Sequence, residues 1–187
     1  CSGILEIKNC TLYYNEVENS PNRINLEGNY TLKIEDSTII CENYSQTFFI
    51  VASCKEKGNV YLIKNSFIEC LNFIGETTYG PQDHNNVSTL VIENCKFENC
   101  QNILSDSIEE KIIINNCIFK NCTNVITMYW NECLLSNSKF ISCYDKIIYY
   151  NGGIIEFCEF IEIKTKNIEF SEDSILLNGK KQNIIRN

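Results

Sequence analysis

A short string of apolar, polar, Asn and Cys residues recurs four times in this chain at nearly constant intervals. It reads IENCKFENC at 92–100, INNCIFKNC at 114–122, LSNSKFISC at 135–143 and IEFCEFIEI at 155–163, so successive copies start 22, 21 and 20 residues apart. Repeats with periods of 20 residues or more are typical of solenoids, whose units pack only on their neighbours. The interval therefore predicts a repetitive architecture.

Polarity within the clearest copy alternates with a period of two, which indicates short strands and not a helix. Ile92, Cys95 and Phe97 are expected to point inward, and Asn94 and Asn99 interrupt the alternation. Asn tolerates left-handed backbone angles, so each Asn can turn the chain within one residue. Short strands joined by such bends wind into coils stacked about 4.8 Å apart. We predict an all-β fold, a single-stranded right-handed parallel β-helix.

Aligning the chain on the bend residue extends the repeat toward the N-terminus. The predicted bend column is Asn9, Asp36, Asn65, Asn94, Asn116, Asn137 and Phe157. An apolar residue comes two places before each bend, Cys or Ser one place after it, and Leu, Ile or Phe three places after it. Phe67 comes one residue early, which predicts a deletion in the third coil. Stacked amides are expected to hydrogen-bond along the buried bend column.

The alignment predicts seven coils and a partial eighth near 168–180, that is, about seven to eight. The first three intervals are longer than the later ones, so each early coil is expected to carry a surface loop, at 15–24, 54–59 and 76–86. We expect one β-helix domain over residues 1–187. Because the chain starts at Cys1, it is expected to be a mature form or a segment of a longer protein.

The charge of the chain narrows the classes of partner. A net charge of −8 and a pI near 4.8 argue against a nucleic-acid partner and against an anionic membrane surface. No apolar run approaches the roughly 18 residues of a membrane span, so we expect no membrane insertion within this segment. The 44% hydrophobic content fits an ordered protein.

Twelve cysteines are an unusually high number for 187 residues. Such a content favours some disulfides and an oxidising compartment. Two predicted columns of inward cysteines run along the stack, one with Cys95 and Cys117 and the other with Cys100, Cys122 and Cys143. These thiols are either small buried hydrophobic groups or disulfides that join adjacent coils. The cysteines that fit these columns poorly are better candidates for bridging, namely Cys1, Cys41, Cys54 and Cys133.

Five Asn-x-Ser/Thr sequons favour secretion weakly, because a chain this rich in Asn contains several by chance. They lie at Asn9, Asn29, Asn43, Asn86 and Asn121. We predict glycosylation at Asn29, Asn43 and Asn86. Together with the cysteines, the sequons predict an extracellular or cell-surface location.

The repeated NCxFxNC unit resembles right-handed parallel β-helix proteins of the adhesin-like and polymorphic surface-protein type. The resemblance is clear over residues 90–163 and looser over 4–76, and NGGIIEF at 151–157 is similar to a Gly-Gly-apolar unit of such surface families. It implies a secreted or cell-surface molecule with an adhesive or structural role. Enzymes also use this scaffold, so the unit marks the fold more than the function.

Few residues offer catalytic chemistry. Polysaccharide-cleaving sites need paired Asp residues, or Asp-bound calcium with an Arg base, and the chain has no adjacent Asp pair and only Arg23 and Arg186. Asp83 and the single histidine, His84, lie together in a polar stretch where such a pair is usually just solvated. We therefore predict no catalytic residues, no metal site and no cofactor.

Four aromatic residues make the best candidate binding patch. Tyr129 and Trp130 precede Tyr149 and Tyr150 by about one coil, with Tyr129 expected above Tyr150, 21 residues on. Exposed aromatic clusters mark binding surfaces, although two of the four could instead pack inside and the others cover a corner.

These observations predict a non-enzymatic extracellular β-helix, an adhesin-like binding or structural shaft that contacts a protein or carbohydrate at a surface. One alternative is a carbohydrate-active β-helix enzyme, a polysaccharide lyase or hydrolase. Another is a filament subunit that self-associates through the open strand edges at the β-helix ends.

Overall fold

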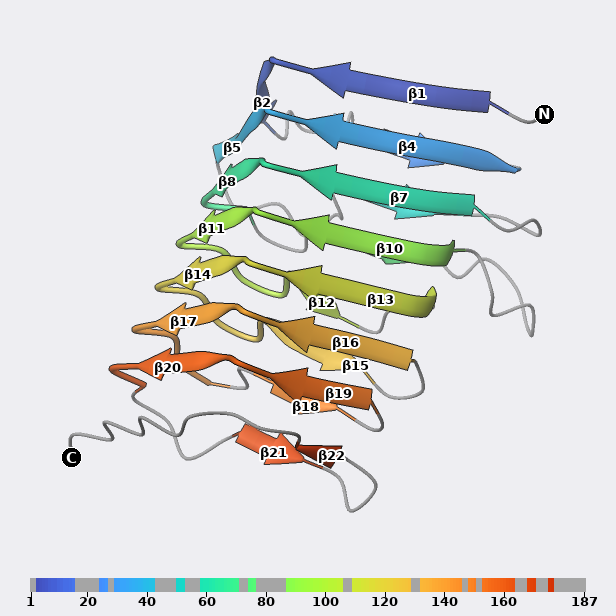
Figure 1. The fold of residues 1–187 in the computed structure, drawn as a ribbon. Coiled ribbons are helices and arrows are strands. Elements are labelled where there is room, and N and C mark those ends of the chain that lie inside the picture. The colour runs from blue at the N-terminus through green and yellow to red at the C-terminus, as the bar shows by residue number, and fades with distance from the viewer. Residues whose placement is uncertain are drawn as a thin grey trace.

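The computed structural model describes thirteen segments of the chain: 3–15, 24–26, 29–42, 50–52, 58–70, 74–76, 87–105, 109–128, 132–145, 148–150, 153–163, 168–170 and 175–176. Every helix or strand assigned within these segments is a β-strand, and the strands form three parallel sheets along one stack (Figure 1).

Each sheet contains one strand from each successive coil. The first sheet contains β1 (Gly3–Lys8), β4 (Tyr30–Glu35), β7 (Gly58–Ile63), β10 (Val87–Glu93), β13 (Glu109–Asn115), β16 (Glu132–Ser136), β19 (Gly153–Glu156) and β22 (Ile175–Leu176). The second contains β2 (Thr11–Asn15), β5 (Thr38–Glu42), β8 (Ser66–Ile68), β11 (Lys96–Glu98), β14 (Ile118–Lys120), β17 (Lys139–Ile141) and β20 (Glu159–Ile161). The third contains β3 (Ile24–Leu26), β6 (Ile50–Ala52), β9 (Ile74–Glu76), β12 (Leu104–Ser105), β15 (Ile126–Met128), β18 (Ile148–Tyr150) and β21 (Ile168–Phe170).

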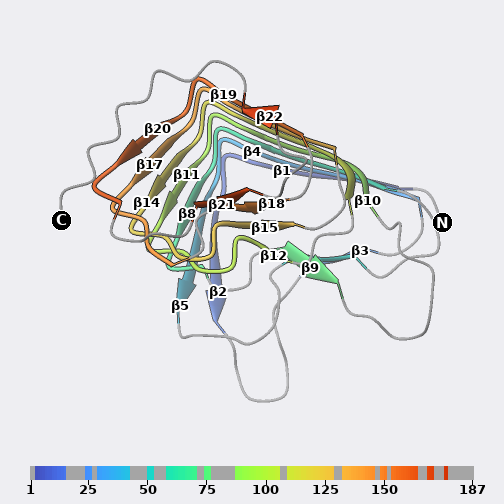
Figure 2. The same cartoon turned by 90° about the horizontal axis from the view of Figure 1, so that it is seen from below.

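This arrangement is a parallel β-helix with seven coils and the start of an eighth at β22, as the repeat predicted. Figure 2 looks along the stack from its C-terminal end. In this view each coil runs counterclockwise as the chain advances toward the viewer, which makes the coil right-handed. Four predicted loop boundaries are wrong, because Asn15 ends β2, Ile24 begins β3, Gly58 and Asn59 begin β7, and Glu76 ends β9.

The bend between the first and second sheets, here the first corner, uses one residue with positive φ in each coil. The residues are Asn9, Asp36, Lys64, Asn94, Asn116, Asn137 and Phe157, with φ between 49° and 56°. The third coil therefore turns at Lys64, and the predicted bend at Asn65 is wrong. Phe67 then comes three places after its corner, as in the other coils, so the predicted deletion does not exist.

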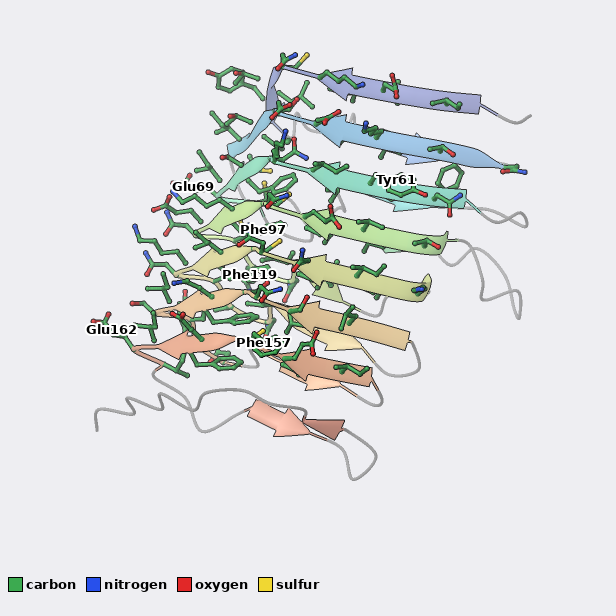
Figure 3. The ribbon with its side chains drawn as sticks, viewed as in Figure 1. Tyr61, Glu69, Phe97, Phe119, Phe157 and Glu162 are labelled. Carbon is green, nitrogen blue, oxygen red and sulfur yellow. The ribbon has the colours of Figure 1, made fainter. Side chains whose placement is uncertain are left out.

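Two further corners complete the later coils. The second corner follows the second sheet and has positive φ at Glu69, Asn99, Asn121, Ser142 and Glu162. The third has positive φ at Asn102, Asn124 and Asp145. Glu69 and Glu162 both lie at the outer edge of the stack in Figure 3. Asn is frequent at these corners because its side chain lowers the cost of the left-handed conformation.

Asn side chains at the corners hydrogen-bond to one another between coils. Asn116 Nδ2 donates to Asn94 Oδ1 at 2.7 Å, and Asn124 Nδ2 donates to Asn102 Oδ1 at 3.0 Å. The prediction of amide hydrogen bonds along the bend column is confirmed for Asn94 and Asn116, whereas Asn102 and Asn124 belong to the third corner. The corners are exposed or half-buried, however, and not buried as predicted. Asn137 also departs from the column, since its Nδ2 donates to Asn115 Oδ1 at 2.9 Å.

Five Phe rings form a single file inside the stack, three places after the first corner. Successive ring centroids from Phe67 through Phe97, Phe119 and Phe140 to Phe160 are 4.6, 5.0, 4.8 and 4.9 Å apart. Strand hydrogen bonding sets this spacing, because equivalent residues of adjacent coils repeat every 4.8 Å or so. The predicted file is confirmed, and Figure 3 shows Phe97 and Phe119 one above the other.

The side chain of the residue after the first corner donates a second hydrogen bond to the carbonyl two places before it, which already accepts one from the corner N–H of the preceding coil. The Ser37 hydroxyl donates to the Glu35 carbonyl at 2.9 Å, and the Cys95 thiol donates to the Glu93 carbonyl at 3.3 Å. Ser and Cys can therefore replace each other at this position. In the third coil the residue is Asn65, which is buried.

Phe157 is the one bulky aromatic at a first corner, and replacing it with Asn is expected to stabilise the protein by about 1 kcal/mol. A left-handed conformation costs a β-carbon residue about 1–2 kcal/mol, and Asn recovers part of this. The Phe157 side chain is 57% exposed, so little packing is lost. The midpoint of urea denaturation should rise for Phe157→Asn and for Phe157→Gly. Phe157→Ala is the control and should not raise the midpoint. An equal rise for this variant would show that the stabilisation comes from removing the aromatic ring and not from relieving the left-handed backbone.

Candidate functional site

Residues in the strands of the first sheet alternate between the core and the outer face. In β4 and β7 every second residue is buried and the residues between them are half-buried. Tyr30, Leu32 and Ile34 therefore face the core, and Lys33 and Glu35 lie on the outer face. The first sheet thus presents three outward columns along the stack.

The central outward column becomes continuously apolar from the third coil onward. Tyr61, Val91, Ile113, Leu134 and Ile154 occupy successive register positions in it. We call these five residues the outer stripe. The first four are half-buried, and Ile154 is 38% exposed. Figure 3 shows Tyr61 on this face of the stack.

Mostly polar side chains border the outer stripe on both sides. One flanking column contains Asn59, Thr89 and Lys111, and the other contains Glu93, Asn115 and Glu156, with the apolar Ile63 beside Tyr61. An apolar centre with a polar rim is the usual arrangement of a protein-binding surface.

Charged side chains replace the stripe in the first two coils. Lys33 lies in register with Tyr61 at the N-terminal end of the stripe. Its Nζ is 3.0 Å from Glu35 Oε2, and Lys8 Nζ is 3.6 Å from the same atom. The hydrogen bond from Lys33 lowers the pKa of Glu35. The apolar part of the face is therefore confined to the third through seventh coils.

Ion pairs occupy much of the outer face of the second sheet. Glu98 lies between Lys96 and Lys120, with Lys120 Nζ at 2.9 Å, and Lys139 Nζ is 3.1 Å from Glu159 Oε2. Hydrogen bonds from Lys96 and then Lys120 lower the pKa of Glu98 to about 2. Such a face is a poorer candidate for apolar contact than the outer stripe, because its charges are already paired and hydrated.

The outer stripe could have been found by aligning the coils of this chain on their bend residues, but the sequence interpretation missed it. Each stripe residue lies three places before a first corner, where alternation leads one to expect a polar residue. Apolar residues at this position in five consecutive coils were the signal. Within a single coil the signal is weak, because a run such as Ile112, Ile113 and Ile114 does not show which residue points outward.

The predicted aromatic patch is only partly described by the structure. Tyr129 and Trp130 lie outside the described residues. Tyr149 and Tyr150 form part of β18, whose backbone pairs with β15, and their side chains lie outside the described part. The predicted register is wrong by one residue, because Tyr150 pairs with Met128 and not with Tyr129.

Of the three predicted glycosylation sites, Asn29 is exposed at a bend before β4, and Asn43 and Asn86 lie outside the described residues. Asp83 and His84 also lie outside them. Within the described segments, no group of three His, Cys, Asp or Glu side chains is placed to hold a metal ion.

The described cysteines all carry free thiols, so the predicted disulfides are not found among them. Cys1 and Cys54 lie outside the described residues. The predicted columns are confirmed, since Cys95 and Cys117, like Cys100, Cys122 and Cys143, are buried in successive coils. Cys133 faces the core between Ile112 and Gly153, so neither register neighbour offers a thiol and its predicted bridging role is unsupported.

Comparison with protein families, curated proteins and solved structures gives no match for this chain. Across the described segments, the structure contains no helix with the length and apolarity needed to cross a membrane.

Proposed function

We propose that this chain is a non-enzymatic β-helix that acts outside the cell or at its surface, as an adhesin-like binding or structural shaft. Its contact surface is the outer stripe. The in-register column from Tyr61 to Ile154 supports this proposal, because a contiguous apolar surface on a rigid sheet marks an interaction site. The cysteine content and the sequons support the extracellular setting.

The chemistry of the stripe favours a protein partner over a carbohydrate. Sugars are bound by aromatic faces and by polar groups that pair with hydroxyls, and Tyr61 is the one aromatic residue of the stripe. Val91, Ile113 and Leu134 instead match the apolar centre of a protein interface. Glu93 and Glu156 on the rim, with a net charge of −8, favour a partner with a basic rim.

The test uses a matched pair of variants on arrays of immobilised extracellular proteins and of polysaccharides. Ile113→Lys places a charge at the centre of the stripe, and Ile118→Lys places the same charge on the outer face of the second sheet, where Ile118 is 38% exposed. We expect a protein that binds the native chain to bind Ile113→Lys at least tenfold more weakly and Ile118→Lys equally well. Higher salt should slow association with this partner.

Two outcomes would contradict the proposal. Equal binding by both variants would remove the outer stripe from the interaction. Release of new sugar ends from an acidic polysaccharide by the native chain would support the carbohydrate-active enzyme instead.

Self-association is a second candidate, because parallel strands of one copy can pair edge to edge with those of another. Leu5 in β1 is 46% exposed and is an apolar side chain that such a contact would cover. Light scattering should then show a mass that rises with concentration and falls for Leu5→Lys. A mass independent of concentration would exclude this candidate.

A further inference from the structure

Five buried thiols form one column beside the Phe file, in five consecutive coils. They are Cys41, Cys70, Cys100, Cys122 and Cys143. The repeat pattern leaves Cys41 outside the predicted columns, and the structure corrects this, because the Cys41 thiol contacts the Cys70 thiol. The column therefore begins in the second coil, two coils before the first NCxFxNC unit at 94–100.

The chain reaches Cys41 by a different backbone path from the other four positions. Cys70 follows the positive-φ residue Glu69, and Cys100 follows Asn99 in the same way. Cys41 instead lies inside the continuous strand β5, two places after Ile39, without a positive-φ residue before it. Residues that follow equivalent corners in successive coils have parallel Cα–Cβ bonds, an orientation that opposes a disulfide. Cys41 and Cys70 are not constrained in this way.

The sulfur positions agree with this difference. Cys41 Sγ lies 2.6 Å from Cys70 Sγ. Cys70 Sγ lies 4.0 Å from the Ile39 carbonyl oxygen of the preceding coil. The equivalent distances are shorter for Cys100, Cys122 and Cys143, at 3.5, 3.6 and 3.3 Å. Cys70 is therefore displaced toward Cys41 and away from the backbone.

We propose that Cys41 and Cys70 are a redox-active pair that closes to a disulfide and clamps the second coil to the third. The oxidant is a small disulfide of the glutathione class. The Cys41 thiolate attacks one glutathione sulfur and releases a first glutathione thiolate. Cys70 then loses its proton and attacks the Cys41 sulfur of the mixed disulfide, which expels the second glutathione. Two thiol protons and two electrons pass from the protein to glutathione disulfide, which becomes two glutathione molecules.

Access favours Cys41 as the thiol that reacts first with the oxidant. Cys41 is 4% exposed and lies one residue before the end of β5, whereas Cys70 is 1% exposed. Strand ends open locally at low free-energy cost, so a small oxidant can reach this thiol without global unfolding. Hydrogen bonding to the Cys100 thiol and then to the Cys41 thiol raises the pKa of Cys70, which makes it the slower nucleophile.

The clamp should stabilise the N-terminal coils measurably. It closes a loop of about 30 residues, and restricting such a loop in the unfolded chain is expected to raise the apparent Tm by about 10 °C. The gain should appear only under oxidising conditions, because reduction of the disulfide restores the two thiols.

To test this proposal, the native chain is equilibrated in buffers with an increasing ratio of oxidised to reduced glutathione. The remaining thiols are blocked with N-ethylmaleimide, and the peptides are mapped without reduction. Cleavage by trypsin together with a Glu-specific protease separates Cys41 from Cys54 at Glu42, and Cys70 from Cys95 at Glu76. We expect a linked peptide pair containing Cys41 and Cys70, together with the rise in Tm. Cys41→Ser should abolish both. Cys117→Ser is the control and should retain both, because Ser138 occupies the equivalent position in the next coil.

Three results would overturn the proposal. The first is full alkylation of Cys41 and Cys70 in the most oxidising buffer. The second is a dominant link between other cysteines. The third is a Tm that does not differ between the oxidised and reduced native chain. The peptide map requires no variant, so it decides the question even if Cys41→Ser folds poorly.

Discussion

Replacing Phe119 with Ala is expected to lower the free energy of unfolding by about 3–5 kcal/mol, as is usual for a buried Phe. Phe119 is 1% exposed. Its ring lies 5.0 Å from that of Phe97 and 4.8 Å from that of Phe140, so the substitution removes stacking on both faces. The cavity cannot close, because backbone hydrogen bonds in the adjacent strands β11, β14 and β17 maintain the spacing of the coils.

Ile118→Ala is the matched control, since Ile118 precedes Phe119 in the same strand but points outward. We expect this variant to cost about 1 kcal/mol or less. Urea denaturation followed by far-UV circular dichroism measures both variants. Similar losses for the two would show that the file of rings is not the main source of stability in this coil.

Replacing Asn65 with Leu is expected to cost about 2–4 kcal/mol, although Leu is apolar and similar in size. Asn65 Oδ1 accepts a hydrogen bond from the Ser37 backbone N–H at 2.9 Å, and its Nδ2 donates to the Ile34 carbonyl at 2.8 Å. Leu would leave both backbone groups buried without these partners, and each unsatisfied buried group costs about 1–3 kcal/mol. The midpoint of urea denaturation should fall accordingly.

Asn65→Ser provides the comparison for this prediction. At the equivalent position of the sixth coil, the Ser138 hydroxyl accepts a hydrogen bond from the Cys117 N–H at 3.1 Å. A Ser at position 65 can do the same for Ser37, so we expect about half the loss seen with Leu. A Leu variant as stable as the native chain would show that these hydrogen bonds contribute nothing to stability.

The repeat predicted the coil, its handedness and the file of Phe rings, because these properties follow from local patterns. Alternation determines which residues point inward, and the left-handed residue determines where the chain turns. The same reasoning failed at Asn65. Asn65 was predicted to be the corner because Asn is common at corners. Lys64 turns the chain instead, and the Asn65 side chain is buried and hydrogen-bonds to the second coil.

The candidate site was much less predictable. The four aromatic residues stood out in the sequence by their chemistry, but register places Met128 and not Tyr129 beside Tyr150. The outer stripe was inconspicuous, because a single coil contributes one aliphatic residue to it. Its continuity exists only between coils, where Val91, Ile113 and Leu134 become neighbours.

From its local patterns alone, the chain could be predicted to wind into stacked right-handed coils, with apolar rings inside and left-handed residues at the corners. Which residues of different coils meet became visible in the folded chain, as the five members of the outer stripe and the Cys41–Cys70 pair show. The difference arises because in-or-out orientation is a local property of alternating strand residues. Lateral register instead depends on hydrogen bonds between strands 20 to 30 residues apart, and a shift of one residue exchanges every inward side chain for an outward one.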